Sequence, residues 1–332
     1  MERNGICVAG SLIADRFFEM DSYPREGFLA TVRSGATHIG GSGNLILDLA
    51  KVDATLPVKV CAVVGEDESG AALMEALGRY DNIDTAAVVR EGESSVTMVM
   101  NAEDTKQRTF FFSPGASNVF DESYIHWDAV DSKIFHLEYL LLMEKVDAPD
   151  PEYGTHGARI LARAKEEGMI TSIDMVSEQS NRVRDVVCPA LKFTDICCIN
   201  EAETQAITGV EVVSRESAVT ALKELARLGV SKWAVIHSPK HNYGYDVLND
   251  RMVCVDSLKL PEGFIKGTTG AGDAFCSGIL YGAHSGEDLE SSMRFATACA
   301  ACSLSESNGT DGMRCRGDVL SVLGQYSQGG VL

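Results

Sequence analysis

The segment Lys266-Gly-Thr-Thr-Gly-Ala-Gly-Asp-Ala-Phe275 has the composition of an anion-binding turn. Gly270, Ala271 and Gly272 carry little or no side chain, so the backbone can approach a ligand closely. The residues that follow, Ala274–Ala283, predict a helix. A glycine-rich turn at the start of a helix directs several N–H groups and the positive end of the helix dipole at one point. The segment therefore predicts a site for a phosphate group.

Asp273 stands at the start of this predicted helix, beside the anion site. Its carboxylate would repel a bound phosphate group unless it had a chemical role. One role is to accept the proton of a hydroxyl group that attacks the γ-phosphorus of a nucleotide. The alternative is that Asp273 only caps the helix. The residues of the segment alone leave both roles open.

Asn200-Glu-Ala-Glu203 directly follows the apolar run Ile196–Ile199. Because Mg²⁺ prefers oxygen ligands and keeps several waters, Glu203 is a candidate to hold Mg²⁺ through water, with Asn200 beside it. The same spacing is typical of a capping box at the start of a helix. The two roles are compatible, and both remain open here.

Gly40-Gly-Ser-Gly-Asn44 is a second glycine-rich turn before a predicted helix. It is not a dinucleotide-binding fingerprint, because Ile46 occupies the position of the third glycine. No GxxxxGK[ST] motif occurs either, which excludes the P-loop enzymes. The turn either lets the backbone approach a polar ligand or is a plain tight turn.

Asp15 follows the first predicted strand, at the end of the sheet that faces the ligand crevice. Its carboxylate either accepts hydrogen bonds from two sugar hydroxyls or belongs to an exposed loop aspartate.

Short apolar runs alternate with helical patterns along the chain. The predicted strands are Ile6–Ala9, Val58–Val64, Ile134–Leu137, Ile170–Asp174, Ile196–Ile199 and Trp233–His237. The predicted helices are Leu45–Leu49, Ser69–Leu77, Gly157–Glu167, Ser217–Leu228 and Ala274–Ala283. This alternation predicts an α/β fold with a mostly parallel sheet covered on both faces. In such a sheet, ligands bind at the carboxyl ends of the strands.

Two segments interrupt this alternation and predict a small second β-layer. Phe17–His38 alternates between apolar and polar residues, and Ser95–Ser113 reads as a hairpin with a polar turn at Ala102–Lys106. Together, residues of about 16–39 and 95–115 are expected either to form a lid that excludes water or to extend the edge of the main sheet. No linker divides the chain, so we expect a single domain over residues 1–332.

Composition restricts the partners and the compartment. The 332 residues are 45% hydrophobic, which supports a sizeable core, and the net charge of −19 disfavours nucleic acids and anionic membranes as partners. No apolar stretch is long enough to cross a bilayer, and the N-terminal residues are not typical of a signal peptide. The 10 cysteines have irregular spacings, so we expect a reducing cytoplasm.

Three motifs together resemble the ribokinase-like, or PfkB, family of carbohydrate kinases over essentially the whole chain. Gly40–Asn44 through Val60-Cys-Ala-Val-Val-Gly-Glu-Asp67 is similar to the N-terminal signature of the family. Gly267-Thr-Thr-Gly-Ala-Gly-Asp-Ala-Phe275 is similar to its C-terminal signature, and Asn200-Glu-Ala-Glu203 matches its NxxE motif. The resemblance implies a three-layer α/β/α domain with a β-sheet lid that often forms dimer contacts.

The resemblance also implies roles for individual residues. Asp273 becomes the general base, and the amides of Gly270, Ala271 and Gly272 become the anion hole for the transferring phosphoryl group. Its other implied roles are contacts to the sugar (Asp15, Gly41 and Asn44), contacts to ATP (Thr268, Thr269, Ala298 and Ser303) and the water shell of Mg²⁺ (Asn200 and Glu203). The implied reaction is transfer of a phosphoryl group from ATP to a primary hydroxyl of a sugar or related polyol. The alternatives are a nucleoside kinase and a catalytically idle sugar-sensing protein on the same fold.

Three positions depart from the family pattern. The Gly40–Gly41 pair is separated from Asn44 by only two residues, one fewer than in the family pattern. Asp174-Met-Val-Ser-Glu178 replaces a segment that is typical of ribokinases, so ribose need not be the acceptor. Gly267 replaces an aspartate that supplies a carboxylate ligand to K⁺ in many family members. Because loss of an anionic ligand weakens a cation site, we expect weak or absent activation by K⁺.

Overall fold

The computed structural model describes residues 3–105, 107–178 and 180–327. Within these residues the main sheet has nine strands in the order β15-β14-β13-β12-β11-β8-β1-β4-β5. The strands from β5 to β13 are parallel, and β14 and β15 are antiparallel additions at one edge. Their bounds are β1 (Ile6–Gly10), β4 (Val58–Val64), β5 (Ile83–Arg90), β8 (Ile134–Leu140), β11 (Ile170–Met175), β12 (Ile196–Asn200), β13 (Trp233–His237), β14 (His241–Asp246) and β15 (Arg251–Asp256).

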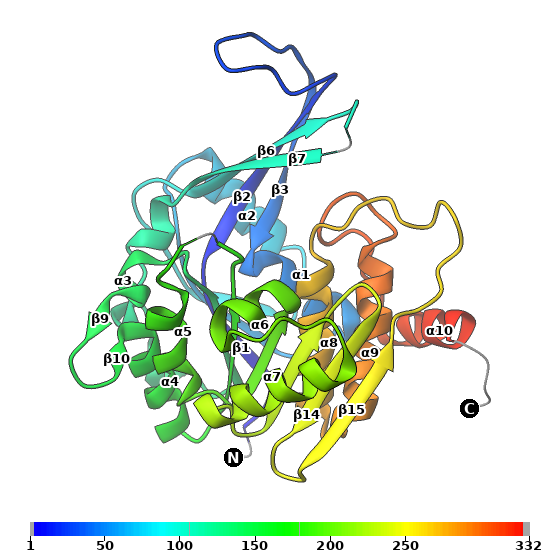
Figure 1. The fold of residues 1–332 in the computed structure, drawn as a ribbon. Helices are drawn as coiled ribbons and strands as arrows, with labels where there is room; N and C mark the ends of the chain where they lie inside the picture. The colour runs from blue at the N-terminus through cyan, green and yellow to red at the C-terminus, as the bar shows by residue number, and fades with distance from the viewer. Residues whose placement is uncertain (1–2, 106, 179, 328–332) are drawn as a thin grey trace.

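Helices cover both faces of this sheet, which gives the three-layer α/β/α architecture (Figure 1). One face packs against α1 (Ser42–Val52), α2 (Glu68–Leu77), α8 (Ala271–Ser285), α9 (Leu289–Ser303) and α10 (Arg316–Tyr326). The other packs against α3 (Glu144–Asp147), α4 (His156–Glu166), α5 (Val183–Leu191), α6 (Glu201–Thr208) and α7 (Arg215–Leu228). Because the middle of the sheet is buried on both sides, its inner parallel strands, such as β1, β4 and β12, are continuous apolar runs rather than alternating ones.

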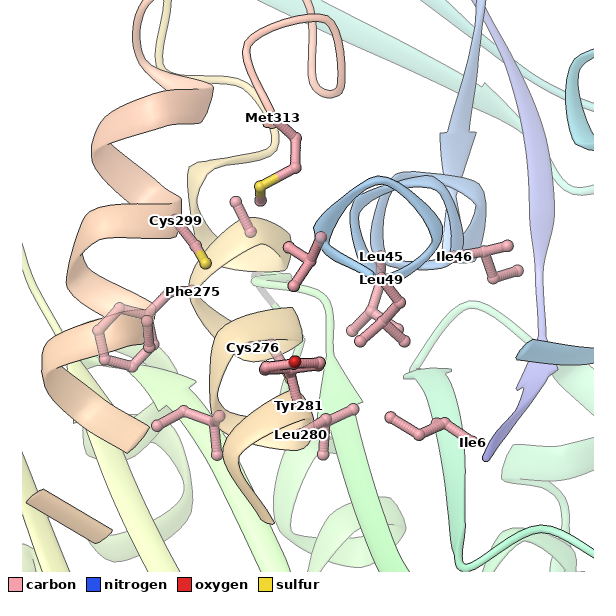
Figure 2. Packing of buried hydrophobic residues seen from close by; sticks show 14 of the residues in the cluster. Ile6, Leu45, Ile46, Leu49, Phe275, Cys276, Leu280, Tyr281, Cys299 and Met313 are labelled. Carbon is pink, nitrogen blue, oxygen red and sulfur yellow. The ribbon is translucent and has the colours of Figure 1, made fainter. Parts of the chain in front are cut away.

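The contact between α1 and α8 brings the two glycine-rich segments of the sequence together. Leu45 and Leu49 repeat at four residues on α1 and are fully buried, as is Leu280 on α8. Figure 2 shows these side chains gathered with Ile6 of β1 in one apolar cluster. The N-termini of the two helices are thereby fixed beside each other above the sheet.

A second, four-stranded sheet stands out from the main body (Figure 1). Its strands run in the order β3-β2-β6-β7, with bounds β2 (Leu12–Met20), β3 (Val32–Gly41), β6 (Ser95–Ala102) and β7 (Gln107–Ser113). We call this sheet the lid. It starts at Leu12, directly after β1, and β3 leads straight into α1, so the lid is broader than residues 16–39 and 95–115. Lys106, in the expected polar turn, lies outside the described residues.

The six predicted strands and five predicted helices are all present, with ends that differ by a few residues. The elements β5, β14, β15, α5 and α10 were not predicted from the sequence. Shorter pieces complete the fold: β9 (Pro149–Asp150), β10 (Gly154–Thr155) and single turns of 3₁₀ helix at Gly115–Asn118, Glu122–Tyr124 and Trp127–Ala129. Over the described ranges, none of the helices has the length and apolar character that a membrane span requires.

Candidate active site

The candidate residues lie at the carboxyl ends of the parallel strands, where an α/β sheet binds ligands. Glu138 lies near the end of β8, Asp174 near the end of β11, Asn200 ends β12 and His237 ends β13. The first turn of α8 and the base of the lid lie over this edge. The structure therefore brings Asp273, Asn44 and Asp15 together from segments that are far apart in the sequence.

Asp273 lies in the first turn of α8 and is held by two side chains. Its Oδ1 accepts a short hydrogen bond from the hydroxyl of Tyr139, and its Oδ2 accepts one of 2.9 Å from Nδ2 of Asn44. Gly270, the residue before α8, has φ 77°, and an added Cβ would lie 2.5 Å from Cα of Gly309. Only glycine fits this turn, and the turn leaves the first amides of α8 without helical partners.

Burial and neighbouring acids raise the pKa of Asp273 from its ordinary value to about 7. Burial is the larger cause and the charge of Glu138 the next, while the hydrogen bonds from Tyr139 and Asn44 act in the opposite direction. Carboxylate oxygens of Glu138, Asp174 and Asp273 lie within 4.8 Å of one another. Burial, followed by the charges of Glu203, Glu138 and Asp273, also raises the pKa of Asp174 well above its usual range. Asp273 therefore has the affinity for protons that a base working near neutral pH requires.

Asp15 lies on β2, at the base of the lid, facing the same space. An added Cβ on Gly40 would lie 2.1–2.7 Å from the carboxyl atoms of Asp15, so the glycine leaves room for this carboxylate. Burial raises the pKa of Asp15 to about 6, against a hydrogen bond from Thr97 that lowers it. Gly41 precedes α1 with φ 60°. Gly40 therefore packs closely against the half-buried carboxylate of Asp15, and the oxygens of a carboxylate can accept hydrogen bonds from the hydroxyl groups of a ligand.

A cavity of about 980 Å³ adjoins the first turn of α8. Thr268, Ala271, Gly272 and His237 line it at the α8 end. Burial lowers the pKa of His237 to about 4, so this imidazole is neutral at physiological pH. The cavity has the size and the mixed lining of a small-molecule site.

The positions on α9 that line this cavity differ from those expected. Ala298 and Ser303 are fully buried and are absent from its lining. The helix instead presents Thr297, Ala300 and Ala301 to the cavity. The physical reason is the helical period: residue 298 and residue 303 point into the core, whereas 297, 300 and 301 share another face.

Asn200 and Glu203 form the capping box of α6. The Asn200 side chain accepts a hydrogen bond from the Glu203 amide, and Oε2 of Glu203 accepts one from the Asn200 amide, both at 2.9 Å. Oε1 of Glu203 accepts a hydrogen bond of 2.6 Å from Ser177. Since both carboxylate oxygens already have a donor, direct coordination of Mg²⁺ fits poorly, but their remaining lone pairs fit a hydrated ion.

The turn before α8 also contacts the lid. Arg108 of β7 donates a short hydrogen bond to the hydroxyl of Thr269. Gly267 stands two residues before Thr269, and an added Cβ on it would lie 2.9 Å from Cα of Ser307. A larger side chain at position 267 would therefore require a shift of the loop that contains Ser307. The ammonium of Lys266 pairs with Glu306 at 2.9 Å.

Sequence reasoning missed Tyr139, Glu138, His237 and Arg108 as site residues. Glu138 and His237 could have been chosen as candidates from the sequence, because each lies at the carboxyl end of a predicted strand, where ligands bind. Arg108 lies in a hairpin whose register with the rest of the lid no local pattern fixes.

Comparisons with known proteins agree with this geometry. A family model described as pfkB family carbohydrate kinase matches residues 3–314. A ribokinase from Arabidopsis thaliana is 25% identical over 323 residues, 96% of this chain and 80% of the relative. An adenosine kinase from Saccharomyces cerevisiae is 28% identical over 200 residues, 58% of this chain and 56% of the relative. The structure of A. thaliana ribokinase complexed with ribose and ATP has the same fold, with a TM-score of 0.82 at 22% identity over 97% of this chain and 99% of that one.

Proposed function

The chain belongs to the pfkB family of carbohydrate kinases, and we propose that it transfers the γ-phosphoryl group of ATP to a primary hydroxyl of a sugar or related polyol, with Asp273 as the general base. The observation that carries this proposal is the position of Asp273. It lies in the first turn of α8 beside the Gly270 turn, is oriented by Tyr139 and Asn44, and has a pKa of about 7.

In the proposed reaction, the acceptor hydroxyl oxygen forms a bond with the γ-phosphorus. The bond from that phosphorus to the bridging β–γ oxygen breaks, and its electron pair leaves with ADP. The hydroxyl proton passes to the carboxylate of Asp273. The amides of Gly270, Ala271 and Gly272 stabilise the negative charge on the oxygens of the transferring group. Asp15, Gly41 and Asn44 would hold the acceptor in line with this movement.

The nucleotide would occupy the 980 Å³ cavity, with Thr268 and Thr269 near its phosphates and Thr297, Ala300 and Ala301 near its base. When bound with ATP, Mg²⁺ supplies positive charge to the phosphate oxygens. Glu203 and Asn200 would hold its waters, in keeping with the hydrogen bonds that already occupy one lone pair on each oxygen of Glu203.

A screen of acceptors tests the proposal. The purified protein is incubated with ATP, Mg²⁺ and a panel of sugars, polyols and nucleosides, and ADP release is measured for each. We expect at least one compound with a free CH₂OH group to raise ADP release well above the rate with ATP alone, and Asp273→Asn to abolish the rise. A panel without any stimulating compound would favour an idle sensor instead.

A nucleoside is the second candidate acceptor, and the lid supplies the observation that favours it. Phe110 and Phe112 lie on the same face of β7 as Arg108, because side chains alternate along a strand. Their side chains are 57% and 36% exposed, which leaves aromatic surface next to the site for a nucleobase to stack on. The nucleosides in the panel decide between the two classes.

The assembly and location of the protein are also proposals. Large apolar side chains are exposed on the lid and on the loop between β2 and β3, and a homodimer through the lid would cover many of them. They are Val32, Met98, Phe110, Phe111 and Phe112 on the lid and Tyr23, Phe28 and Leu29 on the loop. All ten cysteines are free, which suits a protein of the reducing cytoplasm.

A further inference from the structure

Lys51 joins α1 to the loop between α9 and α10. We call this loop, residues 304–315, the connecting loop. Nζ of Lys51, in the last turn of α1, donates a hydrogen bond of 2.7 Å to the backbone carbonyl oxygen of Thr310, across 259 residues of sequence. Thr310 is buried, so the ammonium holds an inner part of the loop. The contact fixes the connecting loop to the helix whose first turn carries Asn44.

The connecting loop packs against both glycine-rich segments of the candidate site. Gly309 directly precedes Thr310, and an added Cβ on Gly270 would lie 2.5 Å from Cα of Gly309. An added Cβ on Gly309 would lie 2.6 Å from Oδ1 of Asn44. The loop therefore supports the turn of the anion hole and also the side chain that holds Asp273. A shift of Thr310 would be passed on to both.

The connecting loop has a shape of its own that does not depend on the ammonium. Oδ1 of Asn308 accepts hydrogen bonds from the amides of Thr310 (3.2 Å) and Asp311 (2.8 Å), and Nδ2 of Asn308 donates to Oδ2 of Asp311 at 2.7 Å. Met313, near the end of the loop, lies in the apolar cluster to which α1 contributes (Figure 2). Removal of the Lys51 ammonium should therefore shift the loop locally rather than release it.

The ammonium of Lys51 lies near acids. Asp48, one turn earlier on α1, is fully buried, and within the described residues neither of its carboxylate oxygens has a hydrogen-bond partner. Burial raises the pKa of Asp48 well above its usual range, while the charge of Lys51 acts against this rise and that of Asp273 adds to it. Burial lowers the pKa of Lys51, and the charges of Asp48 and Asp311 act in the opposite direction. The positive charge of Lys51 thus acts on a group of acids that extends to the base.

We propose that Lys51 is a positioning residue, a built-in cation that holds the connecting loop, and through Gly309 the anion-hole turn and Asn44, in the place that phosphoryl transfer requires. The proposal rests on the kinase function proposed above and adds a residue to it. Lys51 contacts neither substrate and exchanges no proton in the transfer step. Its effect is geometric, because backbone amides stabilise the charge that develops in the transition state only where they are aimed at the oxygens that carry it.

The alternative is that Lys51 only ties the connecting loop to the body of the protein. Lys51→Met removes the charge and keeps most of the apolar length. Lys51→Ala also leaves space beside the cavity of about 210 Å³ that Lys51, Thr310 and Asp311 line. Lys133→Met is the matched control, since the Lys133 ammonium donates a hydrogen bond of 2.6 Å to the backbone carbonyl of His284, at the other end of α8. It removes the same kind of long-range contact without touching the connecting loop.

Kinetic measurements separate positioning from stability. They give kcat, the KM for the acceptor that the screen identifies, and the dissociation constants of Mg²⁺–ADP with and without aluminium fluoride, which mimics the transferring phosphoryl group. We expect Lys51→Met to lower kcat by about 10–10²-fold, the scale of a small misplacement of reacting groups. The gain in affinity from aluminium fluoride should fall with kcat, while the affinity for Mg²⁺–ADP alone changes much less. Lys133→Met should keep the kinetics of the wild type.

Rescue by a free cation tests the charge itself. Lys51→Ala removes the atoms of an n-propylammonium ion from the side chain, and the carbonyl oxygen of Thr310 remains to accept a hydrogen bond from that ion. We expect n-propylammonium to raise the kcat of Lys51→Ala at saturating substrates. Tetramethylammonium at the same ionic strength should not, because it has no N–H donor. The wild type and Lys133→Met should respond to neither ion.

The outcomes distinguish this inference from the proposed function. If Lys51→Met keeps its kcat, if Lys133→Met loses as much, or if n-propylammonium leaves the kcat of Lys51→Ala unchanged, the inference is overturned while the kinase function stands. Thermal unfolding checks each variant. If neither variant of Lys51 folds, the residue serves the stability of the whole chain, and the inference is overturned in this case too. A wild type without acceptor-stimulated ADP release would remove the proposed function and the inference together.

Discussion

Nδ2 of Asn44 donates a hydrogen bond of 2.9 Å to Oδ2 of Asp273 across 229 residues of sequence, joining the first turns of α1 and α8. The family resemblance assigns Asn44 to the sugar. In the structure the side-chain nitrogen of Asn44 donates its hydrogen bond to Asp273 instead. Oδ1 of Asn44 is buried and has no hydrogen-bond partner in the described part of the chain. A substrate hydroxyl is the partner we expect for that oxygen. Asn44 would then orient the base and the acceptor with one side chain.

Asp273→Asn should retain the fold and ATP binding, since the side chain keeps its shape. It should lower kcat by at least the roughly 10²–10⁴-fold typical of the loss of a general base. Steady-state kinetics with the best acceptor measures the loss, and titration with ATP measures binding. ATP affinity equal to or above that of the wild type is expected because one negative charge is removed. A variant with near-normal turnover would refute the assignment.

The rate should depend on the ionisation of Asp273. A base works only when deprotonated, so with a pKa of about 7 the rate should fall about tenfold per pH unit below that value and level off above it. Glu138→Gln removes the neighbouring charge that raises this pKa, so the acid limb should move to lower pH. Tyr139, Asn44 and Asp15 keep their own influence on Asp273 in the variant.

A pH–rate profile of kcat/KM for the wild type and Glu138→Gln checks this shift. An acid limb at the same pH in both proteins would mean that a group other than Asp273 controls it. Glu138 is fully buried and contacts His136, so thermal unfolding must show that the variant is folded at each pH.

Glu203→Gln tests the role of the NxxE segment. The glutamine oxygen still accepts from the Asn200 amide and its nitrogen still contacts Ser177, so the cap of α6 survives. If Glu203 holds the waters of Mg²⁺, the Mg²⁺ concentration for half-maximal rate should rise. A Mg²⁺ titration at saturating ATP and acceptor is the measurement. An unchanged Mg²⁺ dependence together with normal turnover would leave Glu203 as a cap alone.

K⁺ should activate the enzyme weakly or not at all. Gly267 supplies no carboxylate, and the approach of Ser307 to within 2.9 Å of an added Cβ means that none could be introduced without moving that loop. Lys266 neither enters nor fills the space beside the anion hole, because its ammonium pairs with Glu306. Initial rates at matched ionic strength, with K⁺ replaced by a bulky organic cation, test this. A rise of about tenfold with K⁺, about 1.4 kcal/mol in the barrier, would contradict it.

The lid should form a homodimer through the face turned away from Arg108. Phe111 and Met98 pair across β6 and β7 on that face and are 44% and 36% exposed. Phe111→Asp should therefore shift the protein toward monomer in analytical ultracentrifugation. Val213→Asp, at a more exposed apolar position outside the lid, is the control. A wild type that sediments as a monomer at micromolar concentration would exclude the dimer.

The sequence predicted the elements that carry strong local patterns. The buried strands β1, β4, β8, β11, β12 and β13 are short apolar runs, and the capping box at Asn200 follows from spacing alone. The antiparallel β14 and β15 follow β13 with no helix between them, so the strand–helix alternation that predicted the parallel strands does not extend to them. The contacts of Asp273 with Tyr139 and of Thr269 with Arg108 depend on packing and register between distant segments, which spacing along one chain does not encode.

The long separations within the site have a consequence for folding. Asn44, Arg108 and Tyr139 meet their partners on or next to α8 across 229, 161 and 134 residues. Contacts this distant form late, because a long loop must close before any of them contributes. During synthesis, the apolar face of α1 and the aromatic side chains of the lid emerge well before α8 can cover Leu45 and Leu49. The nascent chain therefore carries its most aggregation-prone surfaces first, and it becomes a competent enzyme only when its last third docks.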